Sequence, residues 1–108
     1  MAAYLIVHRR EITDPDGLKA YADGVDDTIA SFGGEVVARS DDFEVLEGDW
    51  APGAHHVDSR PGRITVLRFP EMDSLKRWYE SEEYAELKKI RQSSSQSDIA
   101  AVSSADGG

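Results

Sequence analysis

Residues 13–34 read TDPDGLKAYADGVDDTIASFGG and carry the signals of one complete helix. Asp14 suits the N-cap, and Pro15 suits the first helical position, because its missing N–H is not needed there. The apolar side chains of this stretch fall on one stripe of a helix: Leu18, Tyr21, Ala22, Val25, Ile29 and Phe32. Gly33 and Gly34 then end the helix, since glycine tolerates the left-handed backbone conformation found there. The stretch therefore predicts an amphipathic helix.

Short segments rich in β-branched and apolar residues surround this helix. They predict strands over residues 3–9, 35–39, 43–47 and 64–69, and a weak final strand over residues 99–102. Residues 40–42 either form a tight hairpin or place a bulge in one long bent strand, and both arrangements fit the sequence.

A second helical stretch is predicted in two pieces. The first piece carries the apolar stripe Leu75, Trp78 and Tyr79. The second carries the stripe Tyr84, Leu87 and Ile90. A break at Ser81 separates them, because its hydroxyl suits an N-cap.

The order strand, helix, strand, strand, helix, strand is the split β-α-β pattern of a ferredoxin-like α+β fold. In that fold the helices lie on one face of an antiparallel sheet. A length of 108 residues corresponds to one domain. We expect this domain to span residues 1–103, followed by a disordered tail over residues 104–108.

Both faces of the predicted sheet are apolar. In the first strand, Tyr4 and Ile6 alternate with Leu5 and Val7. The helices cover one face only, so the other would expose a larger apolar patch than soluble monomers usually carry. The sequence therefore predicts a homodimer that packs sheet against sheet.

The formal net charge is −9, from 21 acidic and 12 basic residues. Most of it comes from residues 11–49, which hold twelve acidic and two basic side chains. Such acidity repels nucleic acid and anionic membrane surfaces, and no segment has the roughly 20 apolar residues that cross a bilayer. We therefore expect no nucleic acid and no membrane partner, and a cytoplasmic protein. The acidic block is either a solvated helix face or a docking surface for a basic partner.

Several short motifs follow one another in a specific order along residues 3–103. They are Thr13-Asp14-Pro15, Gly33-Gly34, Val45-Leu46-Glu47-Gly48-Asp49-Trp50, Phe69-Pro70, Trp78-Tyr79-Glu80-Ser81-Glu82-Glu83-Tyr84 and Arg91. Together they resemble the bacterial domain-of-unknown-function family 1330, within the dimeric α/β-barrel superfamily. The resemblance implies a ferredoxin-like protomer and a homodimer joined through its sheets, without an established activity. The chain departs from that pattern at residues 51–62, a longer loop than is usual.

His8 is the candidate catalytic residue. It projects with Tyr4 and Ile6 from the sheet face that we expect to face inward. A histidine titrates near neutral pH and can act there as a general base. The alternative is a histidine at a strand end that makes one hydrogen bond or faces water.

Arg39, Trp50, Tyr84 and Arg91 are the candidate ligand-binding residues. Tyr84 and Arg91 are seven residues apart, hence on one helix face. An aromatic wall with one cation suits a small aromatic or carboxylate-bearing ligand. The alternatives are core packing for the aromatic residues and Arg91, and an ion pair with a nearby acid for Arg39.

His55, His56 and Asp58 form the one run with a metal-like composition. Adjacent histidines on a loop can reach one ion, but no third distant ligand is predicted. We therefore expect no metal site and no cofactor.

Three functions fit these features. The first is a homodimer that binds a small organic ligand between sheet and helices, as a binding protein or as a cofactor-independent enzyme. The second is a non-catalytic structural or protein-interaction module that uses the acidic helix face with Asp23, Asp26 and Asp27. The third, a haem- or metal-dependent enzyme, ranks last.

Overall fold

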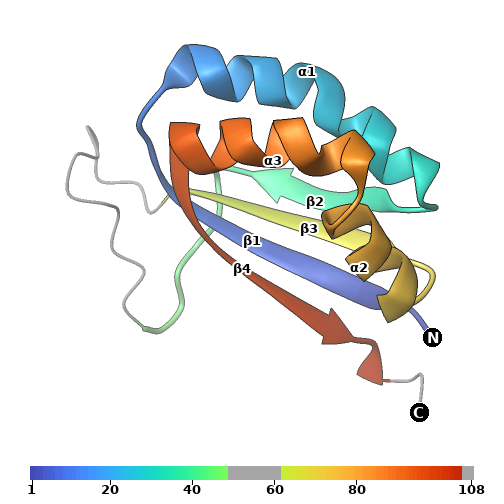
Figure 1. Cartoon of the computed structure of the whole chain (residues 1–108). Coiled ribbons are helices and arrows are strands. Elements are labelled where there is room, and N and C mark those ends of the chain that lie inside the picture. Colours follow the sequence, from blue (N-terminus) through green and yellow to red (C-terminus); the bar gives the residue numbers. More distant parts are fainter. Residues whose placement is uncertain (49–61, 106–108) are drawn as a thin grey trace.

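The computed structural model describes residues 1–48 and 62–105 and forms two layers (Figure 1). Its elements are β1 (Ala3–Ile12), α1 (Pro15–Ser31), β2 (Glu35–Ser40), β3 (Arg63–Phe69), α2 (Met72–Tyr79), α3 (Glu82–Ser94) and β4 (Ser95–Ser103). The strands form one antiparallel sheet in the order β2-β3-β1-β4. All three helices lie on the same side of this sheet (Figure 1). The predicted ferredoxin-like α+β fold, with helices on one face, is therefore confirmed.

The helix boundaries follow their capping residues. Asp14 caps α1, because its Oδ1 accepts a hydrogen bond of 3.2 Å from the Gly17 backbone N–H. Gly33, just beyond the end of α1, has a φ of +79°, the left-handed conformation that favours glycine. Ser81 separates α2 from α3, and its hydroxyl accepts from the Tyr84 backbone N–H at 3.2 Å. The predicted first helix and the break at Ser81 are both confirmed.

Residues 43–47 form no strand, so this part of the prediction is wrong. The register gives the reason: Ser40 pairs with Ile64, and β3 begins only one residue earlier, at Arg63. No residue of β3 remains to pair with the segment after Asp41. Residues 40–42 therefore make neither the expected hairpin nor the expected bulge. The irregularity in β2 lies instead between Val36 and Ala38.

The last strand is longer than its sequence predicts. Residues 99–102 belong to β4, but β4 begins at Ser95, directly after the helix. Serine-rich sequence disfavours a strand locally, yet pairing with β1 overrides that preference. Beyond the strand, the Ser104 N–H donates to the Ala2 carbonyl at 2.8 Å. Residues 106–108 lie outside the described residues, and the extent of the predicted tail stays a prediction.

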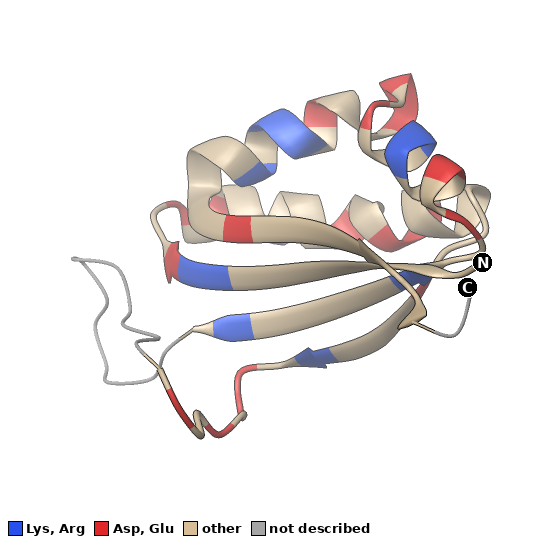
Figure 2. Ribbon diagram, turned by 90° about the horizontal axis from the view of Figure 1, so that it is seen from below, with Lys and Arg blue, Asp and Glu red and all other residues tan. Residues whose placement is uncertain are grey.

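Alternation along the strands gives the sheet its two faces. Leu5 pairs with Leu67, and both are buried on the face that the helices cover. Ile6 pairs with Val66 on the opposite face, where both remain half-buried. In Figure 2, the central parts of the two inner strands, β1 and β3, carry no charged residue. The uncovered face of the protomer is therefore apolar at its centre.

A candidate ligand-binding cavity

A cavity of about 120 Å³ lies between the sheet and the helices. Its apolar lining residues are Leu5, Val7, Leu18, Ala22, Val25, Ile29, Leu67, Trp78 and Ile99. Its polar lining residues are Arg9, Tyr21, Arg39, Arg63, Thr65, Tyr84, Arg91, Ser95 and Ser97. Four arginines are among these described lining residues, and no aspartate or glutamate is. The cavity is thus a largely apolar space with cations in its wall.

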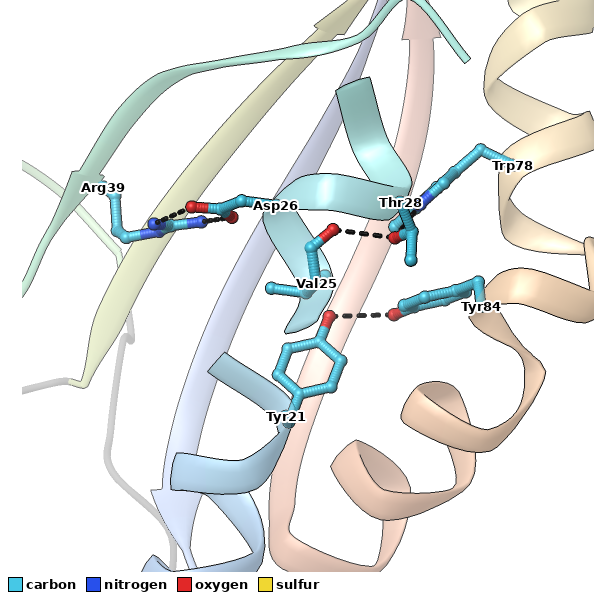
Figure 3. Close-up of polar contacts among 7 residues, drawn as sticks. All are labelled: Tyr21, Val25, Asp26, Thr28, Arg39, Trp78 and Tyr84. Atoms are coloured by element: carbon cyan, nitrogen blue, oxygen red, sulfur yellow. Dashed lines mark hydrogen bonds and ion pairs between the residues drawn. The ribbon is translucent and has the colours of Figure 1, made fainter. Parts of the chain in front are cut away.

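Two tyrosines join the helices across this cavity. The hydroxyl of Tyr21 on α1 lies 2.9 Å from that of Tyr84 on α3 (Figure 3). The Arg91 Nε–H donates to the same Tyr84 oxygen at 3.2 Å. Burial, followed by the nearby Tyr84, raises the pKa of Tyr21, so this hydroxyl keeps its proton. The three side chains therefore form a hydrogen-bonded row on the cavity wall.

Trp78 makes the helical wall of the cavity rigid. Its ring stacks on that of Tyr84, with centroids 4.2 Å apart. Its indole N–H donates to the Thr28 hydroxyl at 2.9 Å, and that hydroxyl donates to the Val25 carbonyl at 2.7 Å (Figure 3). Packing and hydrogen bonds together hold the ring in one orientation.

The four cavity arginines differ in their partners. Arg39 makes two hydrogen bonds to Asp26, at 2.8 and 3.3 Å (Figure 3), and Arg63 pairs with Asp41 at 2.6 Å. For Arg9 and Arg91, no carboxylate of residues 1–48 or 62–105 lies within ion-pair distance.

Burial is the largest single influence on the pKa of Arg9 and of Arg91. Burial and the nearby Arg63 lower the pKa of Arg9, against the attraction of Asp41. Arg91 is only 9% exposed. Burial lowers its pKa, but Tyr84, Tyr21 and Tyr79 together outweigh burial, and the net shift is upward. Both guanidinium groups stay charged at neutral pH, because an arginine pKa starts so high.

Three of the predicted ligand-binding residues meet in this cavity. Arg39, Tyr84 and Arg91 come from β2 and α3, and all three line it. The expected acid partner of Arg39 is present as Asp26. Trp50 lies outside the described residues, and its role stays a prediction.

His8 does not share the cavity with the other candidates. In the sheet, His8 pairs with Ile64 of β3 and Asp98 of β4. Because side chains alternate along a strand, His8 points to the face opposite Leu5 and Val7, away from the helices. There its ring meets that of Phe43 edge-on, with centroids 6.3 Å apart. The cavity lies between the sheet and the helices, as expected, but His8 is not among its lining residues. A role for His8 as general base stays a prediction.

Sequence reasoning missed Arg9 and Tyr21. Alternation from Leu5 and Val7 places Arg9 on the helix-covered face, so the signal for it was present. The sequence predicts Tyr21 as one more member of the apolar stripe of the first helix, and only its contact with Tyr84 shows its polar role.

The metal-like run at residues 55–58 lies outside the described residues. Within residues 1–48 and 62–105, no group of three or more histidine, aspartate or glutamate side chains is placed to hold a metal ion. None of the described helices is both long enough and apolar enough to cross a membrane.

Comparison with solved structures places the fold among known ones. RPA0582, a protein of unknown function from Rhodopseudomonas palustris, aligns with a TM-score of 0.69 and 18% identity over 94% of this chain and 80% of that one. SnoaB from Streptomyces nogalater, a cofactor-independent oxygenase, aligns with a TM-score of 0.64 and 10% identity over 95% and 92% of the two chains. A dimeric ferredoxin-like protein of unknown function from Bacteroides fragilis aligns with a TM-score of 0.54 and 9% identity over 95% and 96%.

The sequence comparisons address the family directly. No curated protein matches the sequence at a significant level. Residues 2–105 match the family described as domain of unknown function DUF1330. Because this match covers nearly the whole chain, the protein belongs to the DUF1330 family.

Proposed function

We propose that this protein binds a small organic ligand in the cavity between its sheet and its helices. The observation that carries the proposal is the cavity itself: a space of about 120 Å³ with an apolar lining and a few polar groups that converge on it. An engineered protein cavity of roughly 150 Å³ holds benzene. A ligand with a body about the size of one aromatic ring therefore fits here.

The lining suits such a ligand chemically. Trp78 and Tyr84 offer stacked aromatic rings, and Tyr21 and Tyr84 offer hydroxyl groups within the same wall. Binding sites for small molecules typically combine an apolar lining with a few placed polar groups. The hydroxyls would orient the ligand, while the apolar wall would supply most of the binding free energy.

The proposed functional unit is a homodimer joined through the open faces of two sheets. Ile6, Ile64 and Val66 supply apolar side chains to that face. The dimeric ferredoxin-like protein from Bacteroides fragilis has the same fold. A second copy would remove this apolar surface from water and leave the helix-side cavity of each protomer in place.

Catalysis without a cofactor would be an extension of ligand binding. SnoaB, with the same fold, is a cofactor-independent oxygenase, but the shared fold does not transfer its chemistry. The alternative, an interaction module that uses the acidic face of α1, has less support because Asp26 is already paired with Arg39.

A thermal-shift screen of small aromatic and apolar metabolites tests the proposal. A ligand at 100 times its dissociation constant stabilises a protein by roughly 2.7 kcal/mol. Hits from the wild type are repeated with Ala22→Trp, which places a large side chain on the cavity wall. Ala20→Trp is the matched control, because both alanines are exposed on α1 and only Ala22 lines the cavity.

We expect ligand-induced stabilisation in the wild type and in Ala20→Trp, and its loss in Ala22→Trp. Equal stabilisation of the two tryptophan variants would show that the ligand binds elsewhere and would refute the proposed site.

A further inference from the structure

The cavity changes from apolar to cationic along its floor. In the pairing of β1 with β3, Leu5 lies opposite Leu67 at one end, and Arg9 lies opposite Arg63 at the other. All four residues line the cavity. On the other side of β1, Arg9 pairs with Ser97, which also lines it. At about 3.3 Å per residue, the four steps from Leu5 to Arg9 span about 13 Å. The cavity therefore has an apolar end and a cationic end, and one small molecule can contact both.

Arg91 brings a buried positive charge to this cavity. It is 9% exposed, and its hydrogen bond at Nε goes to a neutral tyrosine hydroxyl. No carboxylate of the described residues pairs with it. Burying a charge is costly unless an opposite charge or several hydrogen bonds compensate it. The tyrosine contacts already favour the charged form of Arg91, and an anion in the cavity would add the opposite charge that residues 1–48 and 62–105 do not supply.

The other cavity arginines also favour an anionic ligand. Arg9 lines the cavity and feels the attraction of Asp41, but no described carboxylate lies within ion-pair distance of it, whereas Arg39 and Arg63 each have one at that distance. Within residues 1–48 and 62–105, Arg9 and Arg91 are therefore the two cavity cations without a direct ion pair. A planar guanidinium also matches a carboxylate geometrically, since two parallel N–H groups can reach its two oxygens.

We infer that the ligand is a small aromatic or aliphatic carboxylate, with its carboxylate on Arg91 and Arg9 and its apolar body against Leu5, Leu67 and Trp78. This inference rests on the proposed binding function and names the ligand class for that same cavity. The Tyr84 hydroxyl holds Arg91 in position through the bond to Nε, and the carboxylate would bind the outer N–H groups of the guanidinium.

The test uses three probes that differ in charge and share an aromatic ring. Phenylacetate carries the carboxylate, phenylacetamide is its neutral counterpart, and toluene has the ring without the polar group. Each is titrated into the full-length, ¹⁵N-labelled protein, and chemical-shift changes of cavity residues give the dissociation constant. We expect toluene to bind, and phenylacetate to bind at least about 10-fold more tightly than phenylacetamide.

Variants then assign the preference to a residue. Arg91→Gln is expected to reduce the ratio of the two dissociation constants to less than about 2. Arg77→Gln is the matched control, since Arg77 is 72% exposed on α2 and outside the cavity. Arg91→Lys keeps the charge and is expected to retain part of the preference, which covers the case in which Arg91→Gln does not fold.

Each outcome has a distinct meaning. Equal or tighter binding of phenylacetamide in the wild type overturns the carboxylate inference and leaves the proposed binding function standing. An undiminished preference for phenylacetate in Arg91→Gln also overturns it, because Arg91 then does not bind the anion. If none of the three probes shifts the cavity resonances, the proposed binding function fails, and the inference fails with it.

Discussion

The indole N–H of Trp78 donates a hydrogen bond of 2.9 Å to the hydroxyl of Thr28, fifty residues earlier in the chain. The same hydroxyl donates a second hydrogen bond to the Val25 carbonyl within α1. Trp78 is 1% exposed, and Thr28 is buried as well. This pair therefore links α2 to α1 through a polar contact that water does not reach.

Thr28→Val should destabilise the protein, because it keeps the shape of the side chain and removes the acceptor for Trp78. A buried N–H without a partner costs about 1–3 kcal/mol. The free energy of unfolding, measured in urea by tryptophan fluorescence, checks this. Thr28→Ser keeps the hydroxyl and is expected to lose clearly less. If valine and serine cost the same, the cause is side-chain packing and not the hydrogen bond.

Tyr84→Phe should cost more stability than Tyr21→Phe. Tyr84 is 1% exposed, and its oxygen accepts from Arg91 and also contacts the Tyr21 hydroxyl. Its removal leaves a buried guanidinium N–H and a second hydroxyl without partners, and we expect a loss of about 2–4 kcal/mol. Tyr21→Phe leaves the Arg91 bond intact, with an expected loss of about 1 kcal/mol. Urea unfolding of both variants decides between this order and the reverse.

Gly34→Ala should destabilise the protein, whereas Gly24→Ala should not. A Cβ at Gly34 would lie 2.6 Å from the Phe69 ring and 2.7 Å from Ile29, inside the core. Such overpacking costs about 1–3 kcal/mol.

Gly24 supplies the matched comparison for this prediction. It lies within α1, and a Cβ there would meet Leu87 at 3.4 Å, an ordinary contact. Alanine is also the better helix former, so Gly24→Ala should gain up to about 1 kcal/mol. Thermal unfolding followed by circular dichroism measures both variants. A destabilised Gly24→Ala would contradict the described packing of α1 on α3.

Val66→Lys should convert the proposed homodimer into a monomer. Val66 lies on the uncovered face of β3, beside Ile6 of β1. A lysine there would place a charge in the proposed interface, and burying it without a partner is strongly unfavourable. Light scattering after size-exclusion chromatography gives the molar mass. Ala20→Lys, on the exposed side of α1, should remain dimeric. A monomeric wild type would remove the basis of the dimer proposal.

Local sequence signals predict much of this fold. Asp14 and Gly33 mark the first helix because capping and left-handed backbone depend on a few neighbouring residues. Ser81 marks the helix break for the same reason. The strand predicted over residues 43–47 failed because a strand needs a partner, and β3 starts too late to provide one. The early start of β4 has the converse cause, since β1 pairs with Ser95 despite its weak local preference.

The candidate site could be predicted only in part. Tyr84 and Arg91 share one helix face, and their spacing alone shows this. Their partner Tyr21 comes from a helix far away in the chain, and no local pattern distinguishes it from the apolar residues beside it. For His8, alternation predicts that the side chain points to the face opposite Leu5. Alternation alone does not predict which of the two faces holds the cavity.

Capping, alternation and periodicity are short-range properties, and the order of helices and strands could therefore be obtained from the residues alone. The charges in the cavity are a long-range property. Among the described residues, Arg39 has a carboxylate partner and Arg91 does not, because α1 brings Asp26 to β2, whereas the hydrogen bond of Arg91 goes to the hydroxyl of Tyr84. That difference arises from the packing of the helices on the sheet. It gives a chain with a net charge of −9 a cavity whose described lining holds four arginines and no carboxylate.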